Sequence, residues 1–285
     1  MSKELDIIKS DEYLNDFITR YGLSDAYVQD HMSIFKAVLE SRALCKDCKG
    51  LYCCRQLSKG ERVDLTYDGV LYSEIEYCDH ALSKLEKERH IASFVYNDIP
   101  DNLQELYLED LNYADDQREL YALMLGILHK QSDKGLYIYG DLGVGKTYMS
   151  IALANSLVDK GNKVAFVKVS SFFNEMRSYI NSDPSMIDRI IVKLQRSDYL
   201  FLDDIGSEAV SDFVRDDILF RILDYRMENG LITMFTSNLD KDELNRHYTY
   251  DRKDKSNAMN AKRLMERIDI LSEDYCLVGS NKRRI

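Results

Sequence analysis

The stretch from Leu136 to Thr147 constrains the fold of this chain more than any other. It opens with an apolar run, Leu136–Tyr139, and continues as Gly140-Asp141-Leu142-Gly143-Val144-Gly145-Lys146-Thr147, which matches the phosphate-binding pattern G-x-x-x-x-G-K-T. The segment after it, Tyr148–Leu157, has helical propensity. Glycines let backbone N–H groups approach phosphate oxygens without a Cβ in the way. The sequence therefore predicts a strand, a phosphate-binding loop (P-loop) and a helix.

The residue types in this loop predict separate roles. We expect Gly140 to Thr147, with Tyr148 in the first helical turn, to bind ATP or ADP, because a helix N-terminus presents its positive dipole end to an anion. Lys146 should reach the β- and γ-phosphates, and the Thr147 hydroxyl should ligate Mg²⁺. A chance glycine turn is the alternative, and the flanking strand-like and helical segments argue against it.

Two further apolar runs end in polar residues. Tyr199–Leu202 is followed by Asp203 and Asp204, the pattern of a Walker-B strand, and Leu231–Ser237 is followed by Asn238. Such strands bring Asp203 to the Mg²⁺ ion and Asp204 to the position of a general base, while Asn238 could bond the γ-phosphate or the attacking water. Acid pairs also cap helices, and an isolated Asn is more often a turn residue. These interpretations therefore depend on the P-loop.

Five of the six cysteines lie between residues 45 and 78. In a reducing compartment such clustering indicates metal binding more often than disulfides. Cys45-Lys46-Asp47-Cys48 offers a half-site for tetrahedral Zn²⁺, and Asp68-Gly69 between two strand-like runs predicts a β-hairpin that returns Cys78 toward it. Cys54 is the expected fourth ligand, with Cys53 and His80 as alternatives. Inert cysteines in a small core are the competing interpretation.

Composition narrows the function classes. The net charge of −11 argues against a broad surface that coats nucleic acid. No apolar run approaches the ~20 residues needed to cross a bilayer, and the N-terminus has no apolar signal region, so we expect a cytoplasmic protein with no membrane partner. A break around Pro100 predicts two domains: residues 1–98, which contain the zinc-binding cysteine cluster, and residues 99–285, an ATPase domain.

The sequence resembles the AAA+ superfamily of ATPases and, within it, the bacterial primosomal helicase loaders of the DnaI type, relatives of DnaC. Five segments carry the resemblance: Gly140–Thr147, Leu202–Gly206, Arg215–Arg226, Phe235–Asn238 and Ala261–Arg267. They span most of residues 100–285. The cysteine module before them distinguishes the DnaI type from plainer relatives.

The expected fold is accordingly α/β, an AAA+ P-loop domain preceded by a small, mostly helical zinc-binding module with a β-hairpin. Five parallel strands should form its sheet: Leu136–Gly140, Lys163–Val169, Tyr199–Asp203, Leu231–Thr236 and Tyr275–Val278. The order typical of the superfamily places the P-loop strand centrally, with ligand at the carboxyl ends of the strands. Cys276 should be buried and inert in the last strand.

The resemblance also implies roles for individual residues. Asn238 looks like the sensor-1 residue, and Arg267 looks like the arginine finger that completes a neighbouring subunit's ATP site, with Arg263 as its rival. Arg283 or Arg284 would be a second sensor. Single-stranded DNA would be contacted from Lys168–Lys193, including Lys168, Phe172 and Arg177, although Phe172 and the adjacent Phe173 are more often core residues. Asp204 departs from the glutamate of most AAA+ ATPases, and no histidine lies between Cys54 and Cys78.

The function that the resemblance implies is ATP-dependent loading of a hexameric, DnaB-type replicative helicase onto single-stranded DNA during primosome assembly, in replication initiation and restart. The zinc module would grip the helicase, the ATPase domains would self-associate, and ATP hydrolysis would act as the assembly and release switch. The alternatives are an IstB-like transposition helper ATPase, a small-molecule kinase, and a non-catalytic zinc adaptor with a structural nucleotide site. The cysteine module argues against the transposition helper. Ser237-Asn238 at the end of a strand, and an arginine that acts on a neighbouring subunit, argue against the kinase. Lys146→Ala would distinguish the third from an ATP-dependent loader, because an adaptor should still support helicase loading and a switch should not.

Overall fold

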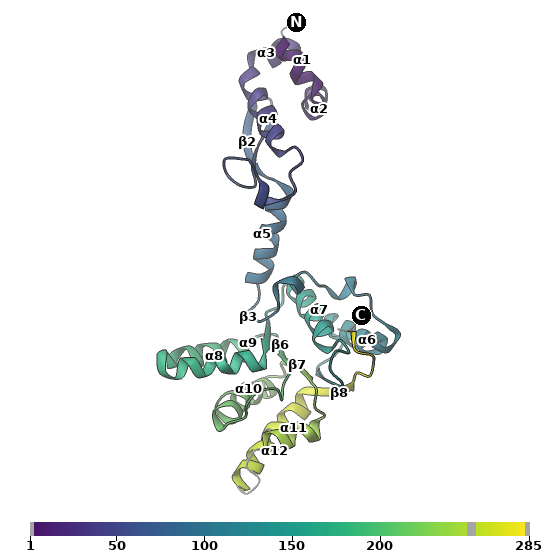
Figure 1. Ribbon diagram of the computed structural model, residues 1–285, viewed down its shortest axis with the longest axis vertical. Helices are drawn as coiled ribbons and strands as arrows, with labels where there is room; N and C mark the ends of the chain where they lie inside the picture. Colours follow the sequence, from purple (N-terminus) through teal and green to yellow (C-terminus); the bar gives the residue numbers. More distant parts are fainter. Residues whose placement is uncertain (1–2, 250–254, 283–285) are drawn as a thin grey trace. The chain divides into compact units, whose positions relative to one another are not determined.

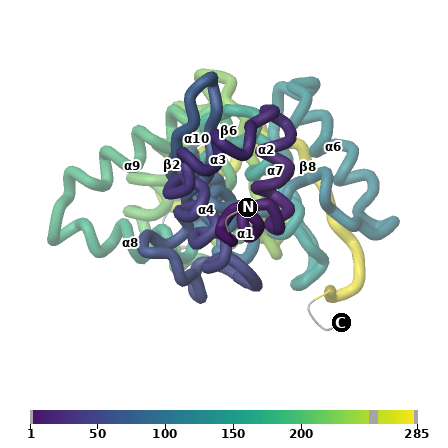
Figure 2. The backbone as a smooth tube through the Cα atoms, turned by 90° about the horizontal axis from the view of Figure 1, so that it is seen from above, coloured from purple at the N-terminus to yellow at the C-terminus, as the bar shows by residue number. Residues whose placement is uncertain are grey.

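The computed structural model describes residues 3–249 and 255–282; the remaining residues are grey in Figures 1 and 2. The chain divides into two compact units, Met1–Glu88 and Arg89–Ile285. This division precedes the expected boundary at residue 98, because β3 (Tyr96–Asn97) pairs with β5 (Val164–Lys168) of the second unit. Among the described residues, no helix is both long and apolar enough to cross a membrane.

The first unit consists of short helices and a β-hairpin. Asp11 and Ser24 cap two of the helices by accepting hydrogen bonds from the backbone N–H groups of Leu14 and Tyr27. The predicted hairpin is confirmed, since β1 and β2 are antiparallel around Asp68-Gly69, with Gly69 at φ +105°. The elements are α1 (Lys3–Ser10), α2 (Glu12–Arg20), α3 (Asp25–Asp30), α4 (Met32–Cys45), η1 (Leu51–Cys53), β1 (Glu61–Tyr67), β2 (Leu71–Tyr77) and the start of α5 (Asp79–Ala92).

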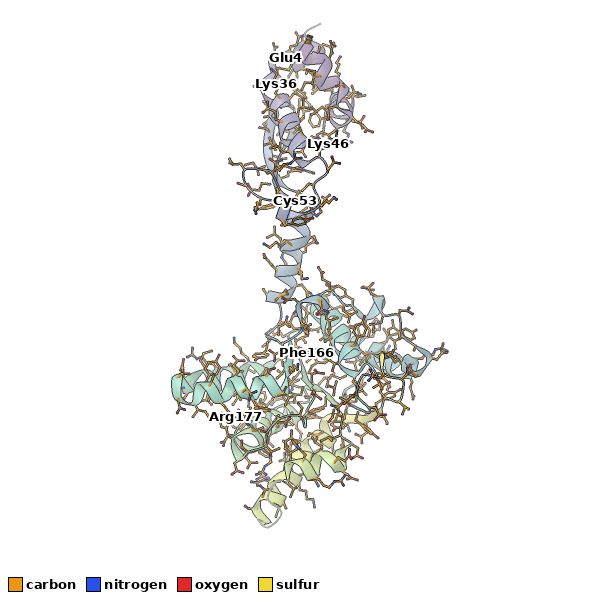
Figure 3. The ribbon with its side chains drawn as sticks, in the orientation of Figure 1. Glu4, Lys36, Lys46, Cys53, Phe166 and Arg177 are labelled. Atoms are coloured by element: carbon orange, nitrogen blue, oxygen red, sulfur yellow. The ribbon has the colours of Figure 1, made fainter. Side chains whose placement is uncertain are left out.

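One hydrophobic core holds the first unit together. Buried side chains of α1, α2, α3 and α4 pack with Leu65 and Leu71 of the hairpin. At the surface, Lys36 of α4 forms an ion pair with Glu4 of α1 (Figure 3). A core of this size is modest, because small domains bury a low fraction of their surface and often need metals or other supports.

The second unit contains a parallel sheet with the strand order β3-β5-β6-β7-β4-β8. The expectation of five strands is therefore wrong: within the described residues the sheet has six, because β3 is too short to produce a sequence pattern. The P-loop strand lies one position from the edge rather than at the centre. The strands after β3 and β5 are β6 (Tyr199–Asp203), β7 (Ile232–Ser237), β4 (Gly135–Tyr139) and β8 (Ser272–Cys276).

Helices cover both faces of this sheet, in two hydrophobic cores. Alternate strand residues serve opposite faces, as Tyr137 does for one core and Leu136 and Ile138 do for the other. Figure 1 shows α6 and α7 on one side and α8 to α12 on the other. The elements are η2 (Asp101–Leu103), η3 (Leu108–Asp110), η4 (Asp115–Gln117), α6 (Arg118–Leu128), α7 (Lys146–Asp159), α8 (Val169–Ser182), α9 (Pro184–Arg196), the π-helical η5 (Phe213–Phe220), α10 (Arg221–Glu228), α11 (Lys241–Tyr248) and α12 (Lys255–Leu271).

Cys276 is exposed, so the expectation that it is buried is wrong. It ends β8, which lies at the edge of the sheet and begins earlier in the chain than predicted. An edge strand is covered less completely than an interior one.

The register of the interior strands brings their carboxyl ends to one edge of the sheet. Tyr139 pairs with Ser237, and Leu202 pairs with Phe235. Asp203, the last residue of β6, therefore lies near Gly140 and Asn238, which directly follow β4 and β7.

Candidate functional site

The P-loop forms the turn between β4 and α7. Gly140, Gly143 and Gly145 have φ values of +143°, +85° and +108°, in the region that favours glycine. A Cβ on Gly140 would lie 2.2 Å from the carbonyl oxygen of Leu277, so a side chain does not fit there. Since α7 begins at Lys146, its N-terminus directly follows the loop. The loop thus has the backbone conformation and the helix terminus that phosphate binding requires.

The side chain of Lys146 lies within this loop and is only 7 % exposed as a residue. Its Nζ donates hydrogen bonds to the carbonyl oxygens of Gly140 (2.7 Å) and Asp141 (2.8 Å) and to Oδ1 of Asn238 (2.9 Å). The structure therefore brings together the predicted phosphate-binding lysine and the amide at the tip of β7.

Asp203, the last residue of β6, is buried beside two hydroxyl groups. Its Oδ1 accepts hydrogen bonds from Thr147 (2.8 Å) and Thr236 (2.6 Å). Burial raises the pKa of Asp203, and the hydroxyls of Thr236 and Thr147 oppose this shift. A carboxylate and a threonine hydroxyl in contact are a donor set suited to Mg²⁺, which prefers oxygen ligands.

Asp204 has a left-handed backbone conformation, with φ of +59°. Its N–H donates to Oγ1 of Thr236 (2.8 Å), and its Oδ1 accepts a hydrogen bond from Nδ2 of Asn238 (2.9 Å). Thr236 thus holds both acidic residues, a role that the sequence analysis missed. The signal was the register of β6 against β7, which cannot be read before the strand order is known. Tyr148, in the first turn of α7, is 45 % exposed.

The predicted arginine finger lies elsewhere, on α12. Arg267 is bonded through Nε to Asp224 Oδ1 (3.0 Å) and through Nη1 to Glu266 Oε2 (2.9 Å), and its side chain is 17 % exposed. Its guanidinium and that of Arg263 both lie over the ring of Phe220, at 4.9 and 4.7 Å from the centroid. Arg263 is exposed. Arg283 and Arg284 lie outside the described residues.

The residues predicted to contact DNA are divided between surface and core. Lys168 is exposed at the end of β5. Arg177 of α8 is half-buried, and its Nη2 donates a hydrogen bond to the carbonyl oxygen of Ala209 (2.7 Å; Figure 3). Phe172 is only 2 % exposed and packs edge-on against Tyr96. The apolar face of α8 covers the sheet, so Phe172 is not presented to a base.

Four of the predicted zinc ligands line a single cavity, together with His80: Cys45, Cys48, Cys54 and Cys78. Gly60 connects two of them, because its N–H donates to the Cys54 sulfur (3.5 Å) and its carbonyl accepts from the N–H of Cys78 (2.7 Å). The Gly60 hydrogen bond lowers the pKa of Cys54, which favours the thiolate. Cys53, labelled in Figure 3, is exposed. Nowhere in the part of the chain described do three or more such side chains form a metal-holding group, so the zinc site stays a prediction.

Comparison with known proteins assigns the family. A family model described as IstB-like ATP binding protein matches residues 75–273. The replicative helicase loader DnaI of Bacillus subtilis (strain 168) is 30 % identical over 254 residues, which cover 86 % of this chain and 80 % of that protein. The chain belongs to the DnaI group of the IstB-like ATP-binding proteins. The resemblance inferred from the sequence is thereby confirmed.

Solved structures agree with this assignment. A crystal structure of DnaI is 30 % identical with a TM-score of 0.57, over 68 % of this chain and all of that one. A putative primosome component from Streptococcus pyogenes serotype M3 is also 30 % identical, with a TM-score of 0.55, over 68 % of this chain and 97 % of that one. The α/β P-loop fold with a parallel sheet is therefore confirmed.

The two matches differ in how far they extend toward the N-terminus. The family model begins at residue 75. The likeness to DnaI covers 86 % of 285 residues, about 245, so it begins no later than about residue 41. The DnaI match therefore includes the segment Cys45–Cys78.

Proposed function

We propose that this protein is an ATP-dependent loader that delivers a hexameric replicative DNA helicase onto single-stranded DNA. The observation that carries the proposal is the convergence of Lys146, Thr147, Asp203, Asp204 and Asn238 at one edge of the sheet. The likeness to a replicative helicase loader through the cysteine segment supports a loader over an IstB-like transposition helper.

Nucleotide binding would redirect the side chain of Lys146. Its acceptors here are two loop carbonyls and the Asn238 amide oxygen. Phosphate oxygens are stronger acceptors for an ammonium group than neutral carbonyls, because the hydrogen bond is charge-assisted at both ends. When Lys146 turns to phosphate, Asn238 is released to bond the γ-phosphate or the attacking water, as a nucleotide sensor must.

Hydrolysis would use the carboxylates at the end of β6. Thr147 and Asp203 would hold Mg²⁺, which neutralises charge on the phosphate oxygens. Asp204 would orient the attacking water, and its backbone is restrained by Thr236 for that role. Loss of the γ-phosphate would remove a partner of Asn238 and release the assembly.

A second copy of the chain would complete the site. We propose Arg267 as the residue that reaches a neighbour's triphosphate, with Arg263 as the alternative on the same helix face. Phe220 supports both guanidinium groups. Arg267 must exchange Asp224 for phosphate when subunits assemble, so that hydrolysis depends on assembly.

The cysteine unit would bind zinc and grip the helicase. The donor set fits, because Cys45, Cys48, Cys54 and Cys78 line one cavity and thiolates are preferred ligands of structural Zn²⁺. Such a site would contribute folding free energy to a unit with a modest core. DNA contact would come from Lys168 and Arg177, without Phe172.

Co-purification with the hexameric replicative helicase of the same organism, with and without ATP, tests the proposal. We expect the wild-type chain to bind the helicase and to deposit it on single-stranded DNA circles when ATP is present. Lys146→Ala should abolish ATP-dependent loading, while Lys160→Ala, an exposed lysine at the other end of α7, should not. Failure to associate in either nucleotide state removes the loader proposal. Normal loading by Lys146→Ala would instead indicate an adaptor with a structural nucleotide site.

A further inference from the structure

The segment after β8 lies along the P-loop. The N–H of Leu277 donates to the carbonyl of Tyr139 (2.7 Å), and the N–H of Lys282 donates to the carbonyl of Gly143 (2.9 Å). Asn281 is so near the loop that a Cβ on Gly143 would lie 2.2 Å from its Oδ1. Figure 1 shows this segment, in yellow, running from β8 toward α6. The C-terminal segment is thus in direct contact with the middle of the predicted phosphate site.

Gln117, just before α6, contacts the P-loop one residue further along, at the carbonyl of Val144. Gln117 is buried; its Nε2 donates to the carbonyl of Val144 (3.0 Å), and its Oε1 accepts from the N–H of Ala114 (3.3 Å). Asp116 connects this segment to the C-terminal one, because its Oδ1 lies 3.4 Å from Nζ of Lys282. Two consecutive P-loop carbonyls are therefore engaged by groups from distant parts of the chain.

These two hydrogen bonds determine where the loop N–H groups point. A trans peptide is planar, and its C=O and N–H point in opposite directions. Because the Gly143 carbonyl points toward the N–H of Lys282, the N–H of Val144 in the same peptide points away from Lys282. Because the Val144 carbonyl points toward Gln117, the N–H of Gly145 points away from Gln117. Backbone N–H groups at these places in a P-loop are the ones that surround phosphate oxygens.

We propose that the backbone N–H of Lys282 and the side-chain amide of Gln117 are positioning groups for the P-loop. Each holds a carbonyl on one side of a peptide and so aims the N–H on the other side at the phosphate chain of a nucleotide. The inference rests on the proposed nucleotide-binding function and extends it to residues outside the loop. Because the N–H groups are aimed before the ligand arrives, binding loses less free energy to ordering the loop. The effect concerns the polyphosphate and not the base.

Matched substitutions test this by removing single donors. Lys282→Pro removes the backbone N–H, whereas Lys282→Ala keeps it and removes only the ion pair with Asp116. Gln117→Met removes the donor, keeps a side chain of similar length and adds no charge beside the phosphate site. Dissociation constants for Mg–ADP and for inorganic tripolyphosphate with Mg²⁺ would be measured for each variant. Thermal unfolding without ligand would confirm that each variant is folded.

Loss of one hydrogen bond should weaken the binding of both ligands about threefold to tenfold in Lys282→Pro and in Gln117→Met, and less than about twofold in Lys282→Ala. Wild-type affinity in both donor variants overturns the inference. Weaker Mg–ADP binding with unchanged tripolyphosphate binding also overturns it, because the segment would then act on the base. A wild-type chain that binds neither ligand overturns the proposed function itself, and with it this inference.

Discussion

Replacing Thr236 with valine should uncouple the two carboxylates at the end of β6 from β7. The Thr236 hydroxyl donates to Oδ1 of Asp203 (2.6 Å) and accepts from the N–H of Asp204 (2.8 Å), and the residue is 3 % exposed. Valine has nearly the same shape, so the perturbation removes two hydrogen bonds with little change in packing. Asp204 then loses the contact that supports its left-handed backbone.

The expected change in the free energy of unfolding follows from these two hydrogen bonds. A hydrogen bond to a carboxylate contributes about 1.5–3 kcal/mol, and a buried N–H left without a partner costs about 1–3 kcal/mol. The additional apolar group of valine offsets about 1 kcal/mol. We therefore expect the free energy of unfolding to fall by about 1.5–5 kcal/mol, which lowers the Tm of a unit this size by about 3–20 °C. Displacement of Asp204 should also lower kcat for ATP about tenfold to hundredfold.

Thermal unfolding of the second unit and steady-state ATP hydrolysis are the assays, and Thr236→Ser is the control. Serine keeps the hydroxyl and loses only a methyl group, so it should cost about 1 kcal/mol and retain most of the activity. If Thr236→Val is as stable and as active as Thr236→Ser, the reasoning about these hydrogen bonds is refuted.

Further predictions concern the other contacts. Arg267→Ala and Lys146→Ala chains, each inactive alone, should regain ATP hydrolysis when mixed, because one supplies the arginine and the other an intact P-loop; no recovery would exclude Arg267 as a residue acting across subunits. The proposed zinc site predicts that a chelator lowers the Tm of the first unit, as should Cys78→Ser, while Cys53→Ser should not; equal effects of both substitutions would contradict the proposed ligands. Burial and a hydrogen bond to Asp64 raise the pKa of Tyr13 to about 12. The stability that this neutral phenol contributes is complete below pH ~10 and is lost as the pH rises through ~12, so denaturant titrations of Tyr13→Phe over that range should show a smaller alkaline loss than the wild type.

Local sequence patterns were sufficient for the parts of the fold that depend on neighbouring residues. The P-loop needs glycines at fixed positions between a strand and a helix, and the hairpin needs Asp68-Gly69 between two strands. Apolar runs ending in polar residues identified Asp203 and Asn238 as strand-end residues, because parallel strands present their carboxyl ends at one edge of a sheet.

Surface exposure could not be predicted in the same way. Phe172 follows two serines and Cys276 stands in an apolar run, yet Phe172 is in the core and Cys276 is exposed. What decides between them is the element that packs against each strand or helix. That element comes from a distant part of the chain.

The identity of the residues proposed to bind and hydrolyse a nucleoside triphosphate was thus predicted from the sequence alone, since their spacing reflects local backbone geometry. Only the tertiary structure decided which residues hold them in place. These are Thr236 of β7, which contacts the end of β6, Gln117 from the segment before α6, and Lys282 from the C-terminal segment. Such contacts join residues far apart in the chain. They depend on strand order and register, which leave no periodic signal in the sequence.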